Sequence, residues 1–479
     1  MNSTVKCGAT RHALNLTFRY SLRLADWRAN LDQQQALLAG YPTPQPALEL
    51  EVALDRCEYF RGIGAGEDAI RAAERAVEWA NALDDDKARA AAYLQLADGH
   101  WSLSQMVKAE QYFELSADFA QRAGTQLLEA TSLELQAQTG MFSGMSSAAI
   151  TARLRRAFAI AEQVGDFHRM ASLLNKYGYL PMSAGMGGLA TAESDYRRGL
   201  VLAEASGDRG MEEMILANLG VLFTLLGDYR QALDSLHSAL RIGAETAGYW
   251  RYWVAHHYKG KCLLQMGQLD EARASLATAI EQLGQLGNHH FEVMARCDLG
   301  LLHHLAGNQE QARAELTFVL DLARQHDDQR YRAWANTRLG YVLEALGDLA
   351  GAGEHYARGC ELHACMGQHF YALNALAGEA RLAAQSGDGV AALAHAGTIW
   401  ETLAGQEPDA TVETARTLRT CYTILRADGD PRAPAVVKAT FDQLCARSAT
   451  IDNPEHVERF WQLDDHRLIA QAFAEERRR

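Results

Sequence analysis

Residues 216–240, LANLGVLFTLLGDYRQALDSLHSAL, decide the fold. Apolar residues recur at helical spacing on both sides of Gly227-Asp228, a dipeptide typical of a turn. The stretch therefore predicts two helices that pack antiparallel, the first ending at Gly227 and the second starting one or two residues later. Three later stretches align with it without gaps, namely AHHYKGKCLLQMGQLDEARASLATAI from Ala255, ARCDLGLLHHLAGNQEQARAELTFVL from Ala295 and ANTRLGYVLEALGDLAGAGEHYARGC from Ala335.

Small residues recur in three columns of this alignment, each advancing by 40 residues. The columns are Gly220, Gly260, Gly300 and Gly340; Gly227, Gly267, Gly307 and Gly347; and Ala232, Ala272, Ala312 and Ala352. The first glycine and the alanine lie where the two helices of a pair must approach closely, so a larger side chain would hold them apart. The second glycine is expected to end the first helix in the left-handed conformation.

The alanine column continues outside these four stretches, which extends the repeat along the chain. It is found going back at Ala192, Ile150, Ala109 and Ala69, and going forward at Ala392. A weaker copy starts near residue 11 and a degraded one covers 411–447, so about ten helix pairs are predicted from 11 to 404. We expect residues 1–46 to form N-terminal capping helices or a degenerate repeat, 47–404 nine repeats, and 405–479 a degenerate repeat with capping helices.

The frame Leu219-Gly220, Phe223, Ala232, Leu236 and Ala239 resembles the tetratricopeptide repeat (TPR). The family's closing proline is missing and the period is about 40 residues instead of 34, so the chain resembles the longer-helix variety found in bacterial signalling regulators and kinesin light chains. This resemblance implies an all-α, right-handed superhelical solenoid with a C-terminal helical cap.

The C-terminal segment adds a second resemblance. Residues 421–433, CYTILRADGDPRA, together with Arg459-Phe460-Trp461 and His466-Arg467-Leu468-Ile469, are similar to the closing part of large bacterial regulators. Those regulators join an ATP-dependent (STAND-type) nucleotide-binding module to a TPR sensor. The chain has no GxxxxGK[ST] motif and no strand-rich region, so ATP-gated behaviour is not carried over to it.

Charge and composition exclude several classes of function. The formal net charge is −14, and an acidic protein repels phosphate backbones, so direct nucleic-acid binding is not expected. No apolar run reaches 18 residues and no secretory h-region is present, so neither a membrane span nor export is expected. The 8 cysteines form no CxxC pair. These features predict a cytoplasmic protein in a reducing compartment.

No arrangement of side chains indicates catalysis, a cofactor or a metal. The adjacent histidines of His256-His257 and His303-His304 point about 100° apart on a helix, whereas ligands that share a metal need one face. The glycine clusters at 62–66 and 185–188 lie where turns between paired helices belong and follow no strand, so they are not phosphate loops. We therefore expect a protein that is not an enzyme and that binds neither a metal nor a cofactor.

The concave face of the solenoid, lined by the first helix of each pair, is the predicted binding surface. With the first glycine taken as position 8, positions 2, 5, 9, 12 and 13 are expected to face inward. The candidate binding residues on this face or beside it are Trp250, Arg251, His257, Lys261, Gln265, Cys297, His304, Trp334, Tyr341, Asn374 and Arg381. Such aromatic, cationic and amide side chains suit a peptide or a polar ligand.

Two functions remain open at this point. The first is a non-catalytic scaffold or regulatory sensor that binds a protein or peptide segment, and the alternative is a small-molecule (metabolite) sensor of a signalling or transcriptional regulator. A peptide site should span a long track, whereas a metabolite site should be one closed pocket within two or three repeats. Replacing His257 and Lys261 by alanine is expected to weaken binding while stability changes by no more than about 1 kcal/mol.

Overall fold

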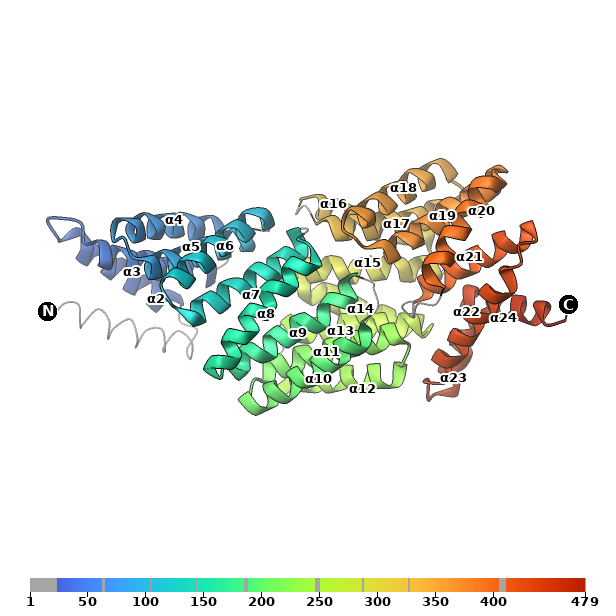
Figure 1. Cartoon of the computed structure of the whole chain (residues 1–479), viewed down its shortest axis with the longest axis horizontal. Helices are drawn as coiled ribbons and strands as arrows, with labels where there is room; N and C mark the ends of the chain where they lie inside the picture. Colours follow the sequence, from blue (N-terminus) through green and yellow to red (C-terminus); the bar gives the residue numbers. More distant parts are fainter. Residues whose placement is uncertain are drawn as a thin grey trace. The chain divides into compact units, whose positions relative to one another are not determined.

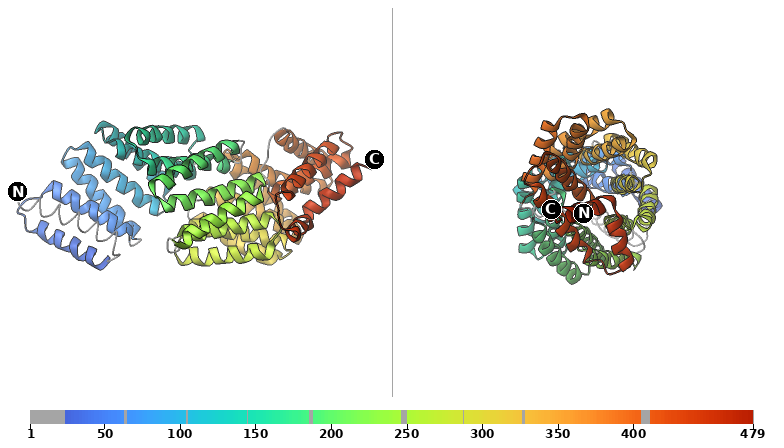
Figure 2. Two further views of the ribbon diagram at one scale, coloured as in Figure 1. Left: turned by 90° about the horizontal axis from the view of Figure 1, so that it is seen from below. Right: turned by 90° about the vertical axis from the view of Figure 1, so that its right-hand side faces the viewer.

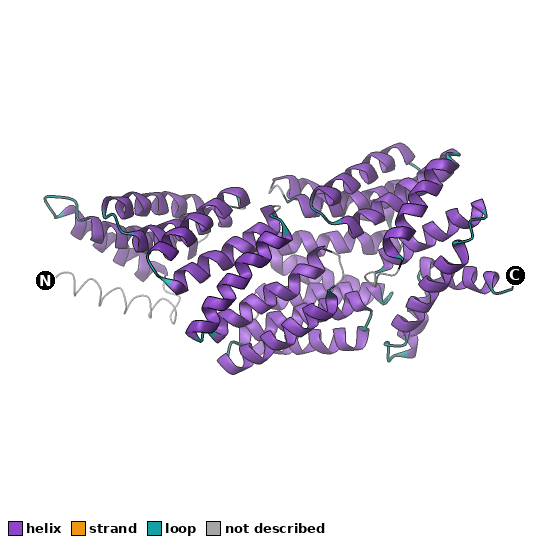
Figure 3. Ribbon diagram, in the orientation of Figure 1, coloured by secondary structure: helices purple, strands orange, loops and turns teal. Residues whose placement is uncertain are grey.

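The computed structural model describes residues 24–62, 65–103, 105–143, 145–184, 188–245, 250–286, 288–325, 328–404 and 411–478. These residues form twenty-three α-helices and no β-strand, so the chain is all-α as predicted (Figure 3). The weak repeat copy expected from residue 11 lies partly outside the described residues. No described helix is both long and apolar enough to span a bilayer.

The helices follow one another in antiparallel pairs (Figure 1). Their bounds are α2 Leu24–Ala39, α3 Pro46–Gly62, α4 Gly66–Ala82, α5 Asp86–Ser102, α6 Met106–Arg122, α7 Gln126–Ser143, α8 Ser147–Val164, α9 Phe167–Ala184, α10 Leu189–Ser206, α11 Arg209–Leu226, α12 Tyr229–Glu245, α13 Trp250–Gln265, α14 Leu269–Gln285, α15 His289–Leu305, α16 Gln309–Gln325, α17 Gln329–Leu346, α18 Leu349–Cys365, α19 His369–Ser386, α20 Gly389–Leu403, α21 Val412–Asp428, α22 Ala433–Ser448, α23 Pro454–Gln462 and α24 Asp464–Glu476.

The chain divides into two compact units, Met1–Gly165 and Asp166–Arg479, a division that the repeat pattern does not predict. Within each unit most of the packing is between helices that follow one another, as Figure 2 shows. In the first unit these are α3 to α8, with α2 against α3. In the second unit α9 to α22 continue the pairing and α24 packs on α21 and α22.

The small-residue columns occupy the places that close helix packing requires. A Cβ atom added at Gly220, Gly260, Gly300 or Gly340 would overlap a Leu or Tyr side chain of the paired helix, namely Leu236, Leu276, Leu316 or Tyr356. The four alanines of the third column are fully buried. The left-handed conformation predicted for the second glycine is confirmed, with φ of 77° at Gly227 and 74° at Gly267. The repeat frame read from the sequence is therefore the frame of the helix pairs.

The second unit turns back on itself, so that residues far apart in sequence meet. Tyr179 Oη of α9 accepts a hydrogen bond of 3.0 Å from Arg330 Nη1 of α17. Arg447 Nη2 of α22 donates to Tyr229 Oη of α12 at 2.6 Å, and the carbonyl of Arg459 in α23 lies against the Gly267 turn. These contacts give the first helices of successive pairs a common interior.

Candidate functional site

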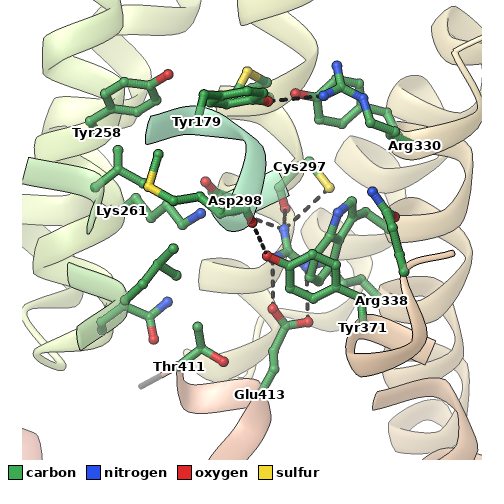
Figure 4. A pocket seen from close by; sticks show the side chains of 18 of the residues that line it. Tyr179, Tyr258, Lys261, Cys297, Asp298, Arg330, Arg338, Tyr371, Thr411 and Glu413 are labelled. Atoms are coloured by element: carbon green, nitrogen blue, oxygen red, sulfur yellow. Dashed lines mark hydrogen bonds and ion pairs between the residues drawn. The ribbon is translucent and has the colours of Figure 1, made fainter. Parts of the chain in front are cut away.

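A pocket lies in the interior of the second unit, and it encloses a cavity of about 140 Å³ (Figure 4). Its walls come from the first helix of successive pairs, α9, α11, α13, α15, α17 and α19, and from the start of α21. We call it the interior pocket; it is lined by Tyr179, Met182, Asn218, Val221, Leu225, Tyr258, Lys261, Gln265, Met294, Cys297, Asp298, Arg330, Tyr331, Trp334, Arg338, Gln368, Tyr371, Thr411 and Glu413. The prediction that first helices form the inner face is thereby confirmed.

A chain of charged side chains crosses the floor of the interior pocket. Arg338 of α17 donates from Nη2 to Glu413 Oε2 at 2.8 Å and from Nη1 to Asp298 Oδ1 at 3.0 Å. The other oxygen of Asp298, Oδ2, lies 2.9 Å from Nε2 of His257. Side chains on α13, α15, α17 and α21 are thus joined through buried ionic hydrogen bonds, which hold the start of α21 against the repeat helices.

These contacts keep the Asp298 carboxyl ionised. Burial alone would raise the pKa of Asp298, but the hydrogen bond from His257 and the positive charges of Arg338 and Lys261 outweigh it and lower that pKa. Burial alone would lower the pKa of Arg338, yet the charge of Glu413 and its neighbours raises it well above the usual value. Arg338 is therefore a permanent cation that is neutralised from two sides.

Lys261 and Tyr258 lie one turn apart on α13 and both face the interior pocket. Within the part of the chain that the structure describes, neither the Lys261 ammonium nor the Tyr258 hydroxyl has a hydrogen-bond or ion-pair partner. Figure 4 shows the Lys261 side chain reaching into the pocket beside Asp298. Burial raises the pKa of Tyr258, so its hydroxyl stays protonated and is a hydrogen-bond donor.

One wall of the pocket is aromatic. Trp334 and Tyr371 pack with ring centroids 4.6 Å apart, and the Arg338 guanidinium lies 5.0 Å from the Trp334 ring centroid. Tyr371 Oη also donates to the carbonyl of Met182 in α9 at 2.8 Å. Rings that are fixed in this way offer flat apolar surface next to cations.

Four of the predicted binding residues, Lys261, Gln265, Cys297 and Trp334, line the interior pocket. Gln265 also holds the start of α21, since its Oε1 accepts from the Val412 amide at 2.7 Å. His257 lies behind the wall, 1% exposed and bonded to Asp298.

The other predicted residues lie away from the pocket. Arg381 is paired with Glu344, whose Oε2 lies 2.7 Å from Arg381 Nη2. Asn374 Oδ1 accepts from Thr417 Oγ1 at 2.9 Å, and His304 Nε2 lies 2.7 Å from Arg416 Nη1. Asn374 and His304 thus contact α21 directly, and Arg381, besides its pair with Glu344, donates to Thr420 of α21. Tyr341 is also buried in this region, and the Arg416 guanidinium lies over its ring. Trp250 lies elsewhere: its ring stacks on Phe291, and the Arg251 guanidinium lies over the Trp250 ring.

The expectation that His257 and Lys261 can be removed together at little cost to stability needs revision. The His257 imidazole is buried and shares Asp298 with Arg338, so His257→Ala leaves a carboxylate oxygen without its donor. Losing such a buried partner costs about 1–3 kcal/mol. Lys261 is half-buried and makes no hydrogen bond to any described residue. Replacing Lys261 alone therefore tests binding with little effect on stability.

Sequence reasoning missed a polar column that the interior pocket uses. Asn218, Tyr258, Asp298 and Arg338 each stand two residues before the first glycine, at position 6, and all four line the pocket. Their 40-residue spacing was a visible signal, but position 6 was not among those expected to face inward. Glu413 and Tyr179 carried no comparable signal, because both lie outside the four well-aligned stretches.

No group of three or more His, Cys, Asp or Glu side chains that could hold a metal occurs among the described residues. What the interior pocket presents instead is fixed cations, hydroxyl donors and aromatic faces. Such an arrangement can bind a polar or anionic group.

His363 makes the stability of this region depend on pH. It is fully buried against Trp334, with Nδ1 2.9 Å from Gln368 Oε1, and burial lowers its pKa from 6.5 to about 4. Below pH 6.5 the unfolded chain binds a proton that the folded chain excludes until about pH 4. We therefore expect this histidine to remove up to about 1.4 kcal/mol of stability per pH unit as pH falls through that window.

The measurement is the free energy of unfolding in urea at pH 7, 6 and 5. His363→Gln should flatten the loss of stability relative to the unmodified chain, whereas His369→Gln, a change at an exposed histidine, should leave it unaltered. Equal pH dependence in the His363 variant and the unmodified chain would show that His363 is not buried as a neutral group.

Part of the chain is similar to known repeat proteins. Residues 253–325 match the family model of the tetratricopeptide repeat, and these residues include α14, α15 and α16. The photosystem I assembly protein Ycf3 of Acaryochloris marina is 33% identical over 87 residues, which are 18% of this chain and 51% of that protein. The chain thus matches about half the length of this curated relative.

Two solved structures are also similar at low identity. A signal transduction ATPase with numerous domains and a TPR sensor, from Pyrococcus horikoshii, is 14% identical with a TM-score of 0.47, covering 78% of this chain and 55% of that one. NprR in complex with its cognate peptide NprX is 12% identical with a TM-score of 0.46, covering 72% of this chain and 99% of that one.

Proposed function

We propose that this tetratricopeptide-repeat protein is a non-catalytic interaction module, which holds a segment of a partner protein in the interior of residues 166–479. The observation that carries the proposal is the interior pocket, where three cationic side chains and five aromatic rings meet. Such groups anchor protein segments, because they combine large contact area with directed polar contacts.

The extent of the lining favours a peptide segment over a metabolite. A compact metabolite site would be built by two or three neighbouring repeats, whereas residues from seven first helices, α9 to α21, line this pocket. The cavity of about 140 Å³ has room for a side chain and little more. We infer that one anchoring side chain enters the cavity while the rest of the segment lies along the first helices.

The setting of this module is also a proposal. The seven described cysteines are free thiols, which favours a reducing compartment such as the cytoplasm. The resemblance of the C-terminal segment to bacterial regulators favours a sensor role in signalling or in the control of transcription.

The proposal can be tested with a displayed library of random twelve-residue linear peptides and the immobilised full chain. We expect selection to enrich related sequences. Trp334→Ala, which removes an aromatic wall of the pocket, should weaken their binding at least tenfold. Trp400→Ala is the matched control, because Trp400 is a partly buried tryptophan of α20 that does not line the pocket.

Two outcomes would overturn the proposal. One is enrichment no greater than on an unrelated helical protein, and the other is equal binding of the selected peptides to both tryptophan variants and the unmodified chain. A small molecule that raises the melting temperature in place of any peptide would favour the metabolite sensor.

A further inference from the structure

We propose that the interior pocket selects an acidic side chain, aspartate or glutamate, of the bound segment, and that Lys261 and Tyr258 receive its carboxylate. This inference rests on the proposed function and specifies which residue of the partner enters the cavity. Both side chains belong to α13 and lie three residues apart, so they stand on one face of the helix.

The balance of hydrogen-bonding groups in the pocket carries the inference. Its two carboxylates are already engaged, since Glu413 is bound by Arg338 and Asp298 by Arg338 and His257. Lys261 and Tyr258, by contrast, are donors with no hydrogen-bond partner among the described residues. A ligand that fits must therefore bring acceptors, and a carboxylate brings acceptors on two oxygens.

The charge of the pocket points the same way. Lys261, Arg330 and Arg338 face two acidic side chains, Asp298 and Glu413, so the lining carries one more positive than negative charge. A cationic side chain would meet a lining of net positive charge in a confined space of low dielectric, which is unfavourable. An anionic one would be attracted, and the hydroxyl of Tyr258 would add a hydrogen bond.

The chain itself supplies an example of this chemistry. Glu413 enters the pocket from the start of α21, and its carboxylate accepts from Arg338 Nε at 3.2 Å and from Nη2 at 2.8 Å. A buried carboxylate is thus accommodated at one end of the pocket by a cation of the first helices. Lys261 and Tyr258 are further donors of the same pocket, and Figure 4 shows Tyr258 near Tyr179 and Lys261 beside Asp298.

The test uses the peptides enriched on the full chain. We expect them to share an Asp or Glu at one fixed position, and its change to Asn or Gln should weaken binding to the unmodified chain at least tenfold. Lys261→Met should weaken the acidic peptide at least tenfold, and Tyr258→Phe about threefold, because it removes only the hydroxyl. The amide-substituted peptide should bind Lys261→Met and the unmodified chain equally.

Lys259→Met is the matched control, since it removes a lysine from the same helix that does not line the pocket. Its affinity for the acidic peptide should stay within twofold of that of the unmodified chain. The change in the peptide itself requires no variant of the protein, so the test holds even if Lys261→Met folds poorly.

The possible failures of the inference and of the proposed function can be told apart. Enriched peptides that share no acidic position, or acidic peptides that bind Lys261→Met as tightly as the unmodified chain, would overturn this inference and leave the interaction module standing. Enrichment of no peptide at all would overturn both.

Discussion

Replacing Arg338 by methionine is expected to lower the free energy of unfolding by about 3–5 kcal/mol. The Arg338 and Glu413 side chains are only 7% and 5% exposed, and Arg338 is the only described cation bonded to Glu413. Without the guanidinium, the Glu413 carboxylate is buried without a counter-charge, and Asp298 loses one of its two hydrogen-bond donors. Urea unfolding of the full chain, followed by circular dichroism, measures the loss.

A double-mutant cycle isolates the ion pair. Glu413→Met alone should also destabilise the chain. The double variant should lose at least 1 kcal/mol less than the sum of the two single changes, because the Glu413 carboxylate is then no longer buried without its counter-charge. Arg313→Ala is the control, since Arg313 is an exposed arginine paired with Glu310, and such pairs contribute about 0–1 kcal/mol. A loss below 1 kcal/mol for Arg338→Met would mean that the start of α21 is not held in the pocket.

Truncation of Phe460 to alanine should destabilise the second unit by about 3–5 kcal/mol. Phe460 of α23 is fully buried, with its ring centroid 6.2 Å from that of Tyr229 in α12 and 4.3 Å from that of His466 in α24. The change leaves a cavity where the C-terminal helices meet a turn of the repeats. It therefore weakens the docking of α23 and α24 as well as the core.

Two measurements check this expectation. Urea unfolding gives the overall loss, and hydrogen exchange should show faster exchange in α22, α23 and α24 than in the unmodified chain. Val390→Ala is the control, because Val390 is 84% exposed and its truncation should change stability by less than about 0.5 kcal/mol. Unchanged exchange in the C-terminal helices of Phe460→Ala would show that they dock by other contacts.

Comparison of Lys261 with Arg338 shows how far sequence reasoning reached the candidate site. Lys261 was found because position 9 was expected to face inward, and it lines the pocket. Arg338 was missed because position 6 was not among the positions expected to face inward. The side of a first helix that faces the interior depends on the small rotation between successive pairs, which accumulates over several repeats. The positions within one repeat do not reveal this accumulated rotation.

The sequence by itself determined the helix pairs, since glycines and alanines at a 40-residue interval allow two antiparallel helices to approach closely, as at Gly300 against Leu316. It also placed the first helices on the inner face. Only the tertiary structure decided which distant segments meet, with Tyr179 on Arg330, Glu413 on Arg338 and Arg447 on Tyr229. Those contacts join residues 75 to 218 positions apart, and they form because each pair turns slightly relative to the last until helices several pairs apart face one another.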